Sequence, residues 1–179
     1  MGFNYSLLRL CTVLATCLLF LACEPEQDTV FTRLDPSATG VSFVNTTGEN
    51  DSFNILTNEY IYNGGGVGIG DFNQDGRPDL FFAGSENENE LYLNRGDWQF
   101  DNISEQAGIG GGRTWNNGVT VVDVNNDGLD DIYVCATLKD DPARRKNQLY
   151  LNQGKNEDGI PTFEDVSEAY GLASTGHNT

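Results

Sequence analysis

The sequence predicts an all-β protein made of repeated four-stranded units, and three observations carry this prediction. The motif Asp-x-Asn-x-Asp-Gly-x-x-Asp occurs at residues 71–79 and again at 123–131, 52 residues later (123 − 71). Short apolar runs, rich in β-branched and aromatic residues, flank both copies as strands would. The sequence Leu-Tyr-Leu-Asn follows each copy, at 91–94 and at 149–152. We therefore expect one structural unit per copy.

Each unit offers four strands in the same order. The first strand precedes the motif, the second follows it, and Leu-Tyr-Leu-Asn is the third. A run led by Phe forms the fourth, at 100–105 and at 163–168. Four short antiparallel strands in a repeat of this length are typical of a β-propeller blade. A solenoid of parallel strands is the alternative, although its repeats are usually shorter. We predict blades at 64–113 and 114–173, and the start of a further repeat at 174–179.

The spacing between matching positions grows along the repeat, which locates two insertions. It rises from 52 residues at the motifs to 58 at Leu-Tyr-Leu-Asn (149 − 91), and to 63 at the Phe-led runs (163 − 100). The added residues fall around 140–146 and 155–160. Both segments are polar with Pro, Gly or charge, so we expect both to be surface loops.

A third Phe-led segment, residues 31–41, matches 100–109 in its Phe, aliphatic, Ala and Gly-aliphatic positions. Nothing similar to the first three strands precedes it. An N-terminal strand that completes the last blade would remove exposed sheet edges. We therefore predict a closing strand and its lead-in at 31–63. Propellers usually have about four to eight blades, so we expect this chain to be the N-terminal portion of a longer propeller.

The repeated motif is also a predicted cation site. It crowds several side-chain oxygens around one point, and carboxylates repel one another unless a cation lies between them. Hard oxygen ligands in a short flexible loop suit Ca²⁺. The loops are not EF-hands, because the twelfth position, which an EF-hand fills with Glu, is Phe82 in one copy and Val134 in the other. Each loop instead joins two predicted strands.

Together with Gly64–Asp71 and Leu149–Asn152, the two loops resemble the VCBS/FG-GAP repeats of integrin-α-type β-propellers. More narrowly, they are similar to large bacterial surface lipoproteins of that class, which often carry an ASPIC/UnbV-type C-terminal module. The resemblance covers about residues 31–179 and implies two Ca²⁺ sites. The ligands it implies are Asp71, Asn73, Asp75, Asp79 and the Arg77 carbonyl in one loop, and Asp123, Asn125, Asp127, Asp131 and the Leu129 carbonyl in the other.

The first 23 residues predict export. The apolar run Leu10–Ala22 is too short to span a bilayer, which takes roughly 20 residues. It ends at Ala22-Cys23, which resembles a bacterial lipoprotein signal in which Cys23 is lipidated. An ordinary secretory signal with an incidental cysteine is the alternative. We expect residues 24–30 to be a tether and the protein to be lipid-anchored at the outer membrane or cell surface. Cys135 would then be the remaining cysteine of the folded part, where we expect a small buried residue.

Composition narrows the function. The formal charge of −17, from 27 acidic and 10 basic side chains, argues against nucleic acid as a partner, because a phosphate backbone needs a basic surface. We find no pairing of nucleophile and base. We expect a non-catalytic Ca²⁺-binding propeller that serves adhesion or scaffolding by binding protein or carbohydrate. The alternative is a polysaccharide-acting enzyme, or a subunit of one, with its site at the propeller channel.

We expect Trp98 and Trp115 to pack in the blades.

The lipoprotein signal predicts that Cys23 carries lipid in the native host, because its thiol would become the acyl acceptor at the mature N-terminus. Mass spectrometry of the N-terminal peptide should show a diacylglyceryl adduct on Cys23, and Cys23→Ser should release the protein from membranes. A mature N-terminus elsewhere, or an unmodified Cys23, would contradict this prediction.

Overall fold

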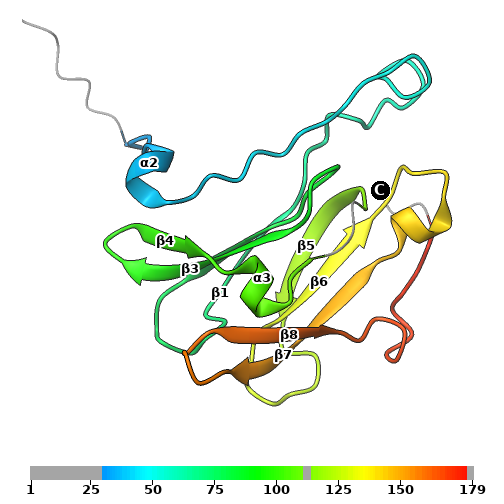
Figure 1. Ribbon diagram of the computed structural model, residues 1–179. Coiled ribbons are helices and arrows are strands. Elements are labelled where there is room, and N and C mark those ends of the chain that lie inside the picture. The colour runs from blue at the N-terminus through cyan, green and yellow to red at the C-terminus, as the bar shows by residue number, and fades with distance from the viewer. Residues whose placement is uncertain (1–29, 111–113, 177–179) are drawn as a thin grey trace, which may run out of the picture. The chain divides into compact units, whose positions relative to one another are not determined.

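The computed structural model describes residues 30–110 and 114–176 (Figure 1). Residues up to Arg33 form a unit of their own, in which residues 30–33 are described. The second unit, Leu34–Thr179, holds all the described helices and strands. The predicted signal peptide with Cys23, most of the predicted tether and residues 177–179 lie outside the described residues. Within the described ranges, no helix has the length and apolar character needed to cross a bilayer.

Two antiparallel meanders of four strands each make up the second unit (Figure 1). The first blade follows the order β1-β2-β3-β4 and the second the order β5-β6-β7-β8. The strands are β1 (Val67–Gly70), β2 (Asp79–Phe82), β3 (Glu90–Gly96), β4 (Gln99–Asn102), β5 (Asn116–Val122), β6 (Asp131–Ala136), β7 (Gln148–Lys155) and β8 (Pro161–Asp165). This arrangement confirms the predicted all-β class and the strand order within each repeat.

The two blades share one hydrogen-bonding register. Leu80 pairs with Tyr92 in the first blade, and Ile132 pairs with Tyr150 at the matching positions of the second. Both third strands then have a β-bulge, which begins at Asn94 in the first blade and at Asn152 in the second. The repeat in sequence is therefore a repeat of strand pairing as well.

The main core lies between the blades. Side chains from β2 and β3 face side chains from β5 to β8, and Phe72, from the loop between β1 and β2, packs edge-on against Phe163 with ring centroids 5.8 Å apart. The core residues are Phe72, Phe81, Ala83, Leu91, Leu93, Ile103, Ala107, Ile109, Ile132, Val134, Tyr150 and Phe163, with Val119, Val121 and Ile160 packed against them. Burial of this apolar surface holds the blades together.

Gly68 in β1 and Gly66 just before it explain how closely the first strands of the two blades approach. A Cβ at Gly66 would lie 2.6 Å from Val119 Cγ2, and a Cβ at Gly68 would lie 2.9 Å from Val119 Cγ1. Any larger side chain at these positions would push β5 away from β1. Gly66 and Gly68 therefore serve contact between the blades.

A short helical turn follows the Phe-led run both in the lead-in, after Phe31, and in the first blade, after Phe100. These turns are α2 (Pro36–Thr39) and α3 (Ser104–Ala107), and each ends at a glycine with positive φ, Gly40 or Gly108. The predicted strand at 31–41 is therefore wrong: residues 31–35 are irregular, and residues 36–39 are helical because Pro36 and the side chain of Asp35 favour a helix start. The closing role of this segment stays a prediction.

Both insertions are surface loops, as predicted. One contains a 3₁₀ turn, η1 (Pro142–Arg145), and the other lies within the hairpin between β7 and β8.

Trp115 is buried as predicted, but Trp98 is 70% exposed. It lies at the tip of the hairpin between β3 and β4, so the prediction that it packs inside the blade is wrong. Cys135 is partly buried, and burial raises the pKa of its thiol.

We predict that Phe72→Ala destabilises the protein by about 3–5 kcal/mol, because it leaves a cavity between the blades. Urea unfolding should show this loss as a lower midpoint. Leu56→Ala is the control, since Leu56 is 94% exposed and its replacement should have little effect. Equal midpoints for the two variants would argue against the packing between blades.

Candidate metal centre

The loop between β1 and β2 is closed by its own side-chain oxygens. Asp71 Oδ1 and Asn73 Oδ1 both accept hydrogen bonds from the backbone N–H of Asp75, at 2.9 and 3.2 Å. Asp71 Oδ2 accepts from Gly76 N at 2.8 Å, and Asp75 Oδ1 accepts from Arg77 N at 2.9 Å. These bonds bring the oxygens of positions one, three and five to the inside of one turn.

The loop between β5 and β6 repeats the same bonds. Asp123 Oδ1 and Asn125 Oδ1 both accept from Asp127 N at 3.1 Å. Asp123 Oδ2 accepts from Gly128 N at 2.9 Å, and Asp127 Oδ1 accepts from Leu129 N at 2.8 Å. The glycines at position six have φ near +83° and +89°, which the turn requires and which glycine adopts without strain.

The donor set of each loop fits Ca²⁺ in kind, with carboxylate and amide oxygens on one short flexible turn. In the described part of the chain, however, no three His, Cys, Asp or Glu side chains are grouped as a metal site. Here the loop oxygens accept bonds from backbone amides. A carboxylate has about four acceptor positions, so these bonds leave further lone pairs for an ion. Calcium binding therefore stays a prediction for Asp71, Asn73, Asp75, Arg77 and Asp79 and for their counterparts Asp123, Asn125, Asp127, Leu129 and Asp131.

The carboxylates at position nine differ from the others, because they are fully buried. Asp79 Oδ2 accepts from Phe72 N at 3.0 Å, and Asp79 Oδ1 accepts from Asn94 N on β3 at 2.8 Å. Asp131 makes the same pair of bonds to Val124 N and to Asn152 N on β7. These side chains therefore join the loop to the third strand, a role that the sequence did not reveal.

The electrostatics of these carboxylates favour a cation. Burial raises the pKa of Asp79 to about 6; its two backbone hydrogen bonds oppose the rise, while the negative charges of Asp75 and Asp71 add to it. Burial likewise raises the pKa of Asp131, with the charges of Asp127 and Asp123 adding to it. A positive ion in the loop would offset this repulsion and favour the ionised form.

Arg77 supplies a positive charge in the first loop. Its Nη2 lies 2.7 Å from Asp75 Oδ2 and its Nε donates to Asn94 O at 3.1 Å. Burial would raise the pKa of Asp75, but hydrogen bonds from Asn73 and Arg77, with the charge of Arg77, lower it overall. Leu129 takes this position in the second loop, so the second loop has no such compensation.

The asparagine of each Leu-Tyr-Leu-Asn run fixes the loop from the other side. Asn94 Nδ2 donates to Pro78 O at 2.8 Å, and Asn94 Oδ1 accepts from Gly96 N at 2.8 Å. Asn152 Nδ2 donates to Asp130 O at 3.2 Å, and Asn152 Oδ1 accepts from Gly154 N at 2.9 Å. The repeated Leu-Tyr-Leu-Asn run marks these asparagines in the sequence, and the structure shows that they join the loop to the third strand.

The two loops also contact each other. Asp71 N donates to Asp130 Oδ2 at 3.1 Å, and Gln74 Nε2 donates to Gly128 O at 2.9 Å. Asn152 Nδ2 also reaches across the interface between the blades to Phe72 O at 2.9 Å. Both candidate sites therefore lie at the same end of the blades and share hydrogen bonds.

Two four-stranded meanders, each with an Asp- and Asn-lined loop between its first and second strands, define part of a β-propeller. Within this portion, residues 71–134 match the family described as FG-GAP-like repeat. They run from the first loop to the strand after the second, so the chain carries an FG-GAP-like repeat. No curated protein matches the chain. An ASPIC/UnbV-type C-terminal module stays a prediction.

We predict that excess Ca²⁺ raises the melting temperature relative to chelator, and that Mg²⁺ at the same concentration raises it less. Asp75→Ala and Asp127→Ala should each remove one bound ion and part of the Ca²⁺-dependent rise. In chelator, Asp75→Ala should destabilise the protein more than Asp127→Ala, because Asp75 also loses its ion pair with Arg77, whereas Leu129 takes that position in the second loop. Calorimetry and metal analysis measure these quantities. Equal melting temperatures in Ca²⁺ and chelator would contradict the calcium sites.

We predict a different result for Asp79→Ala. Removing this carboxylate leaves the buried N–H groups of Phe72 and Asn94 without their acceptor, at a cost of about 1–3 kcal/mol each. The free energy of unfolding should therefore fall in chelator as well as in Ca²⁺. Asp75→Ala is the matched comparison. An Asp79→Ala loss that vanished in chelator would show that Asp79 acts only as an ion ligand.

Proposed function

We propose that the chain is a Ca²⁺-stabilised, non-catalytic propeller portion held at a bacterial envelope, where it binds protein or carbohydrate. The observation that carries the calcium part is the repetition of the loop bonds, from Asp71 to Arg77 and from Asp123 to Leu129. One such loop would be an isolated turn. Two loops with the same hydrogen bonds, at the same place on two blades, favour the same role for both, which is cation binding.

In this proposal calcium supplies positive charge to the loop, where the negative charges of Asp71 and Asp75 act on Asp79. The chain's own residues hold the turn: Asp79 and Asn94 join it to β3, and Gly76 allows the reversal. An ion that binds only the folded state stabilises that state by mass action. The role of the ion is thus structural, and binding of a partner falls to other loops.

The opposite end of the blades offers a surface for a partner. The lead-in and the loop between β6 and β7 line a pocket of about 390 Å³. Lys139 helps to shape it, with Nζ 4.2 Å from the Phe53 ring centroid, 4.6 Å from the Trp115 ring and 2.8 Å from Glu86 Oε1. The lining residues are Asn50, Ser52, Phe53, Asn58, Leu138, Lys139, Asp140, Asp141 and Arg144. This mixture of amide, hydroxyl and charged groups suits a polar ligand such as a sugar or a peptide.

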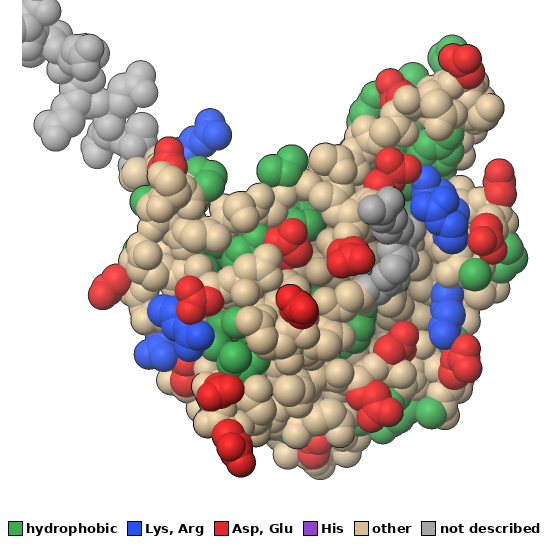
Figure 2. Space-filling model, in the orientation of Figure 1, with side chains coloured by type: hydrophobic (Ala, Val, Ile, Leu, Met, Phe, Trp, Pro, Cys, Tyr) green, Lys and Arg blue, Asp and Glu red, His purple; other side chains and the backbone are tan. Residues whose placement is uncertain are grey.

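The surface charge narrows the partner further. Figure 2 shows carboxylates spread over the visible face and Lys or Arg side chains in a few places. With 27 acidic and 10 basic side chains, the chain favours neutral or basic partners over nucleic acid. Attachment through lipid on Cys23, followed by the tether, would present the blades outside the membrane.

The binding proposal is tested with arrays of glycans and of envelope and matrix proteins, probed with the Ca²⁺-loaded protein. Asn58→Ala and Asp140→Ala should reduce the binding of any hit at least tenfold, since both side chains line the pocket. Asp158→Ala, in the hairpin between β7 and β8, is the matched control and should leave binding unchanged. Hits that respond equally to all three variants, or no hits, would count against this surface.

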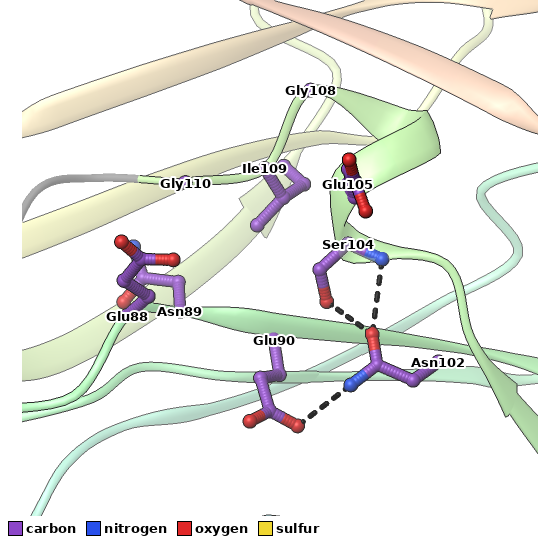
Figure 3. Close-up of a pocket in the computed structure, with 9 residues that line it drawn as sticks. All are labelled: Glu88, Asn89, Glu90, Asn102, Ser104, Glu105, Gly108, Ile109 and Gly110. Atoms are coloured by element: carbon purple, nitrogen blue, oxygen red, sulfur yellow. Dashed lines mark hydrogen bonds between the residues drawn. The ribbon is translucent and has the colours of Figure 1, made fainter.

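A second candidate function rests on a different pocket. A concavity of about 560 Å³ lies beside β3, β4 and α3, and Glu88, Glu90 and Glu105 line it together with Asn102 and Ser104 (Figure 3). Asn102 Nδ2 donates to Glu90 Oε2 at 2.9 Å, and Tyr92 OH donates to the same oxygen. Pairs of carboxylates hydrolyse glycosidic bonds, so these residues are the candidates for the alternative, a polysaccharide-acting enzyme.

A panel of polysaccharides and chromogenic glycosides separates the two candidates. The enzyme candidate expects turnover that Glu88→Gln and Glu105→Gln abolish while the melting temperature stays unchanged. The binding candidate expects no turnover from the unmodified chain, with glycan or protein binding that survives both substitutions.

A further inference from the structure

The two candidate cation loops are joined by hydrogen bonds from residues that stand next to predicted ligands. Asp71 N donates to Asp130 Oδ2 at 3.1 Å, and Gln74 Nε2 donates to Gly128 O at 2.9 Å. None of Gln74, Gly128 and Asp130 is itself a predicted ligand. Each stands in the chain between two predicted ligands, so a movement of either loop is passed to the ligands of the other.

Asp130 fits closely against the start of the first loop. A Cβ built at Gly70, the last residue of β1, would come within 2.9 Å of Asp130 Oδ2. The carboxylate therefore lies directly on the backbone from which the first loop leaves its strand. Pro78 takes the matching position of the first loop (130 − 52), and proline has no side-chain acceptor. This link is thus made by the second loop to the first.

A second route between the loops is buried. Phe72 N donates to Asp79 Oδ2 at 3.0 Å, and Phe72 O accepts from Asn152 Nδ2 at 2.9 Å. Asn152 N in turn donates to Asp131 Oδ1 at 2.8 Å. Three hydrogen bonds in series therefore connect a predicted ligand of the first loop with a predicted ligand of the second. Phe72 is 1% exposed and Asn152 is 2% exposed, so these bonds are shielded from water.

The cost of ordering a loop determines how two linked sites act on each other. Ion binding must offset the conformational entropy that a short flexible loop loses. When the second loop is ordered, Asp130 and Gly128 are fixed, and their partners Asp71 and Gln74 are held with them. An ion that then enters the first loop has less freedom to remove, so it binds more tightly.

Charge acts in the opposite direction. An ion in one loop cancels part of the negative charge that attracts an ion to the other. Salt weakens this charge effect, whereas the buried hydrogen bonds are affected less. The net coupling is therefore favourable at physiological salt, and it falls as the salt concentration is lowered.

We propose that the two loops bind Ca²⁺ as a coupled pair, in which Asp130 and Gln74 are positioning residues that transmit the order of one loop to the other. The inference rests on the calcium part of the proposed function and adds regulation to it. Both loops and all the links lie within the two described blades. The chain then gains or loses both ions over a narrow range of Ca²⁺ concentration.

The test is calorimetric titration of the full chain with Ca²⁺ at physiological salt, in competition with a chelator. Asp127→Ala leaves the first loop to bind, and Asp75→Ala leaves the second, so these variants give the two single-loop association constants. In the unmodified chain, the overall constant for binding both ions should exceed the product of those two constants by at least about fivefold. We call this ratio the coupling factor.

Asp130→Ala and Gln74→Ala should each lower the coupling factor toward one, because each removes a hydrogen bond between the loops and no predicted ligand. The single-loop constants are measured again in each background. Asp130→Asn keeps an acceptor oxygen for Asp71 N and removes only the charge, so it should retain most of the coupling factor.

Asn126→Ala is the matched control for Gln74→Ala. Asn126 and Gln74 hold the same position in their loops and both have positive φ, +61° and +53°, so alanine meets the same backbone strain at either one. Asn126 is not part of either link, and its replacement should leave the coupling factor unchanged.

Hydrogen exchange in chelator gives a readout that needs no ion. Asp75→Ala opens the first loop, and the exchange rates of the Gly128 and Leu129 amides in the second loop should rise about threefold. The rise should disappear when Gln74→Ala and Asp130→Ala are already present. Exchange rates in the second loop that ignore Asp75→Ala would overturn the mechanical link.

The outcomes separate this inference from the calcium sites themselves. Two bound ions with a coupling factor of one would overturn the coupling and leave the calcium sites standing. An unmodified chain that binds no Ca²⁺ would overturn the sites, and coupled binding with them. A coupling factor that Asp130→Ala and Gln74→Ala leave intact, or that Asn126→Ala lowers equally, would overturn the roles of Asp130 and Gln74.

Discussion

The structure of each blade depends on a buried carboxylate that binds two backbone N–H groups from different parts of the chain. Asp79 holds the start of its loop and the end of β3 together, and Asp131 does the same in the second blade. Because both side chains are fully buried, separating a carboxylate from its N–H partners inside the folded blade would leave buried polar groups unsatisfied, at a cost of about 1–3 kcal/mol each. The loop, the strand that follows it and the third strand therefore form one rigid unit.

The packing between blades builds on these rigid units. Phe72 reaches the second blade because its own N–H is fixed by Asp79, and its carbonyl is then held by Asn152. The glycines of β1 allow Val119 and Val121 to approach the first blade closely. The interface thus combines a fixed apolar side chain with close contact between backbones. A conventional core of large side chains fills the space between the later strands.

Periodic features were readable from the sequence and single contacts were not. The strands, their order and both insertions followed from motif spacing and from the apolar runs. The helical start at Pro36 was missed because the match of this segment to the Phe-led run outweighed the local signal of Asp35 and Pro36. Trp98 was misplaced because aromatic character alone does not reveal that a residue lies at a hairpin tip. Asp79 accepts two hydrogen bonds, and the one from Asn94 depends on strand register, which brings together residues 15 positions apart.

The two ends of each blade differ in how much change they can absorb. At one end the loop is joined to the third strand by Asp79 or Asp131 and to the neighbouring loop by Asp130, so a change in length would break several bonds at once. At the other end the second blade holds extra residues around Pro142–Arg145, and its strand register still equals that of the first blade. New sequence grafted between β6 and β7 would therefore leave the blades in place, and this end is suited to diversification.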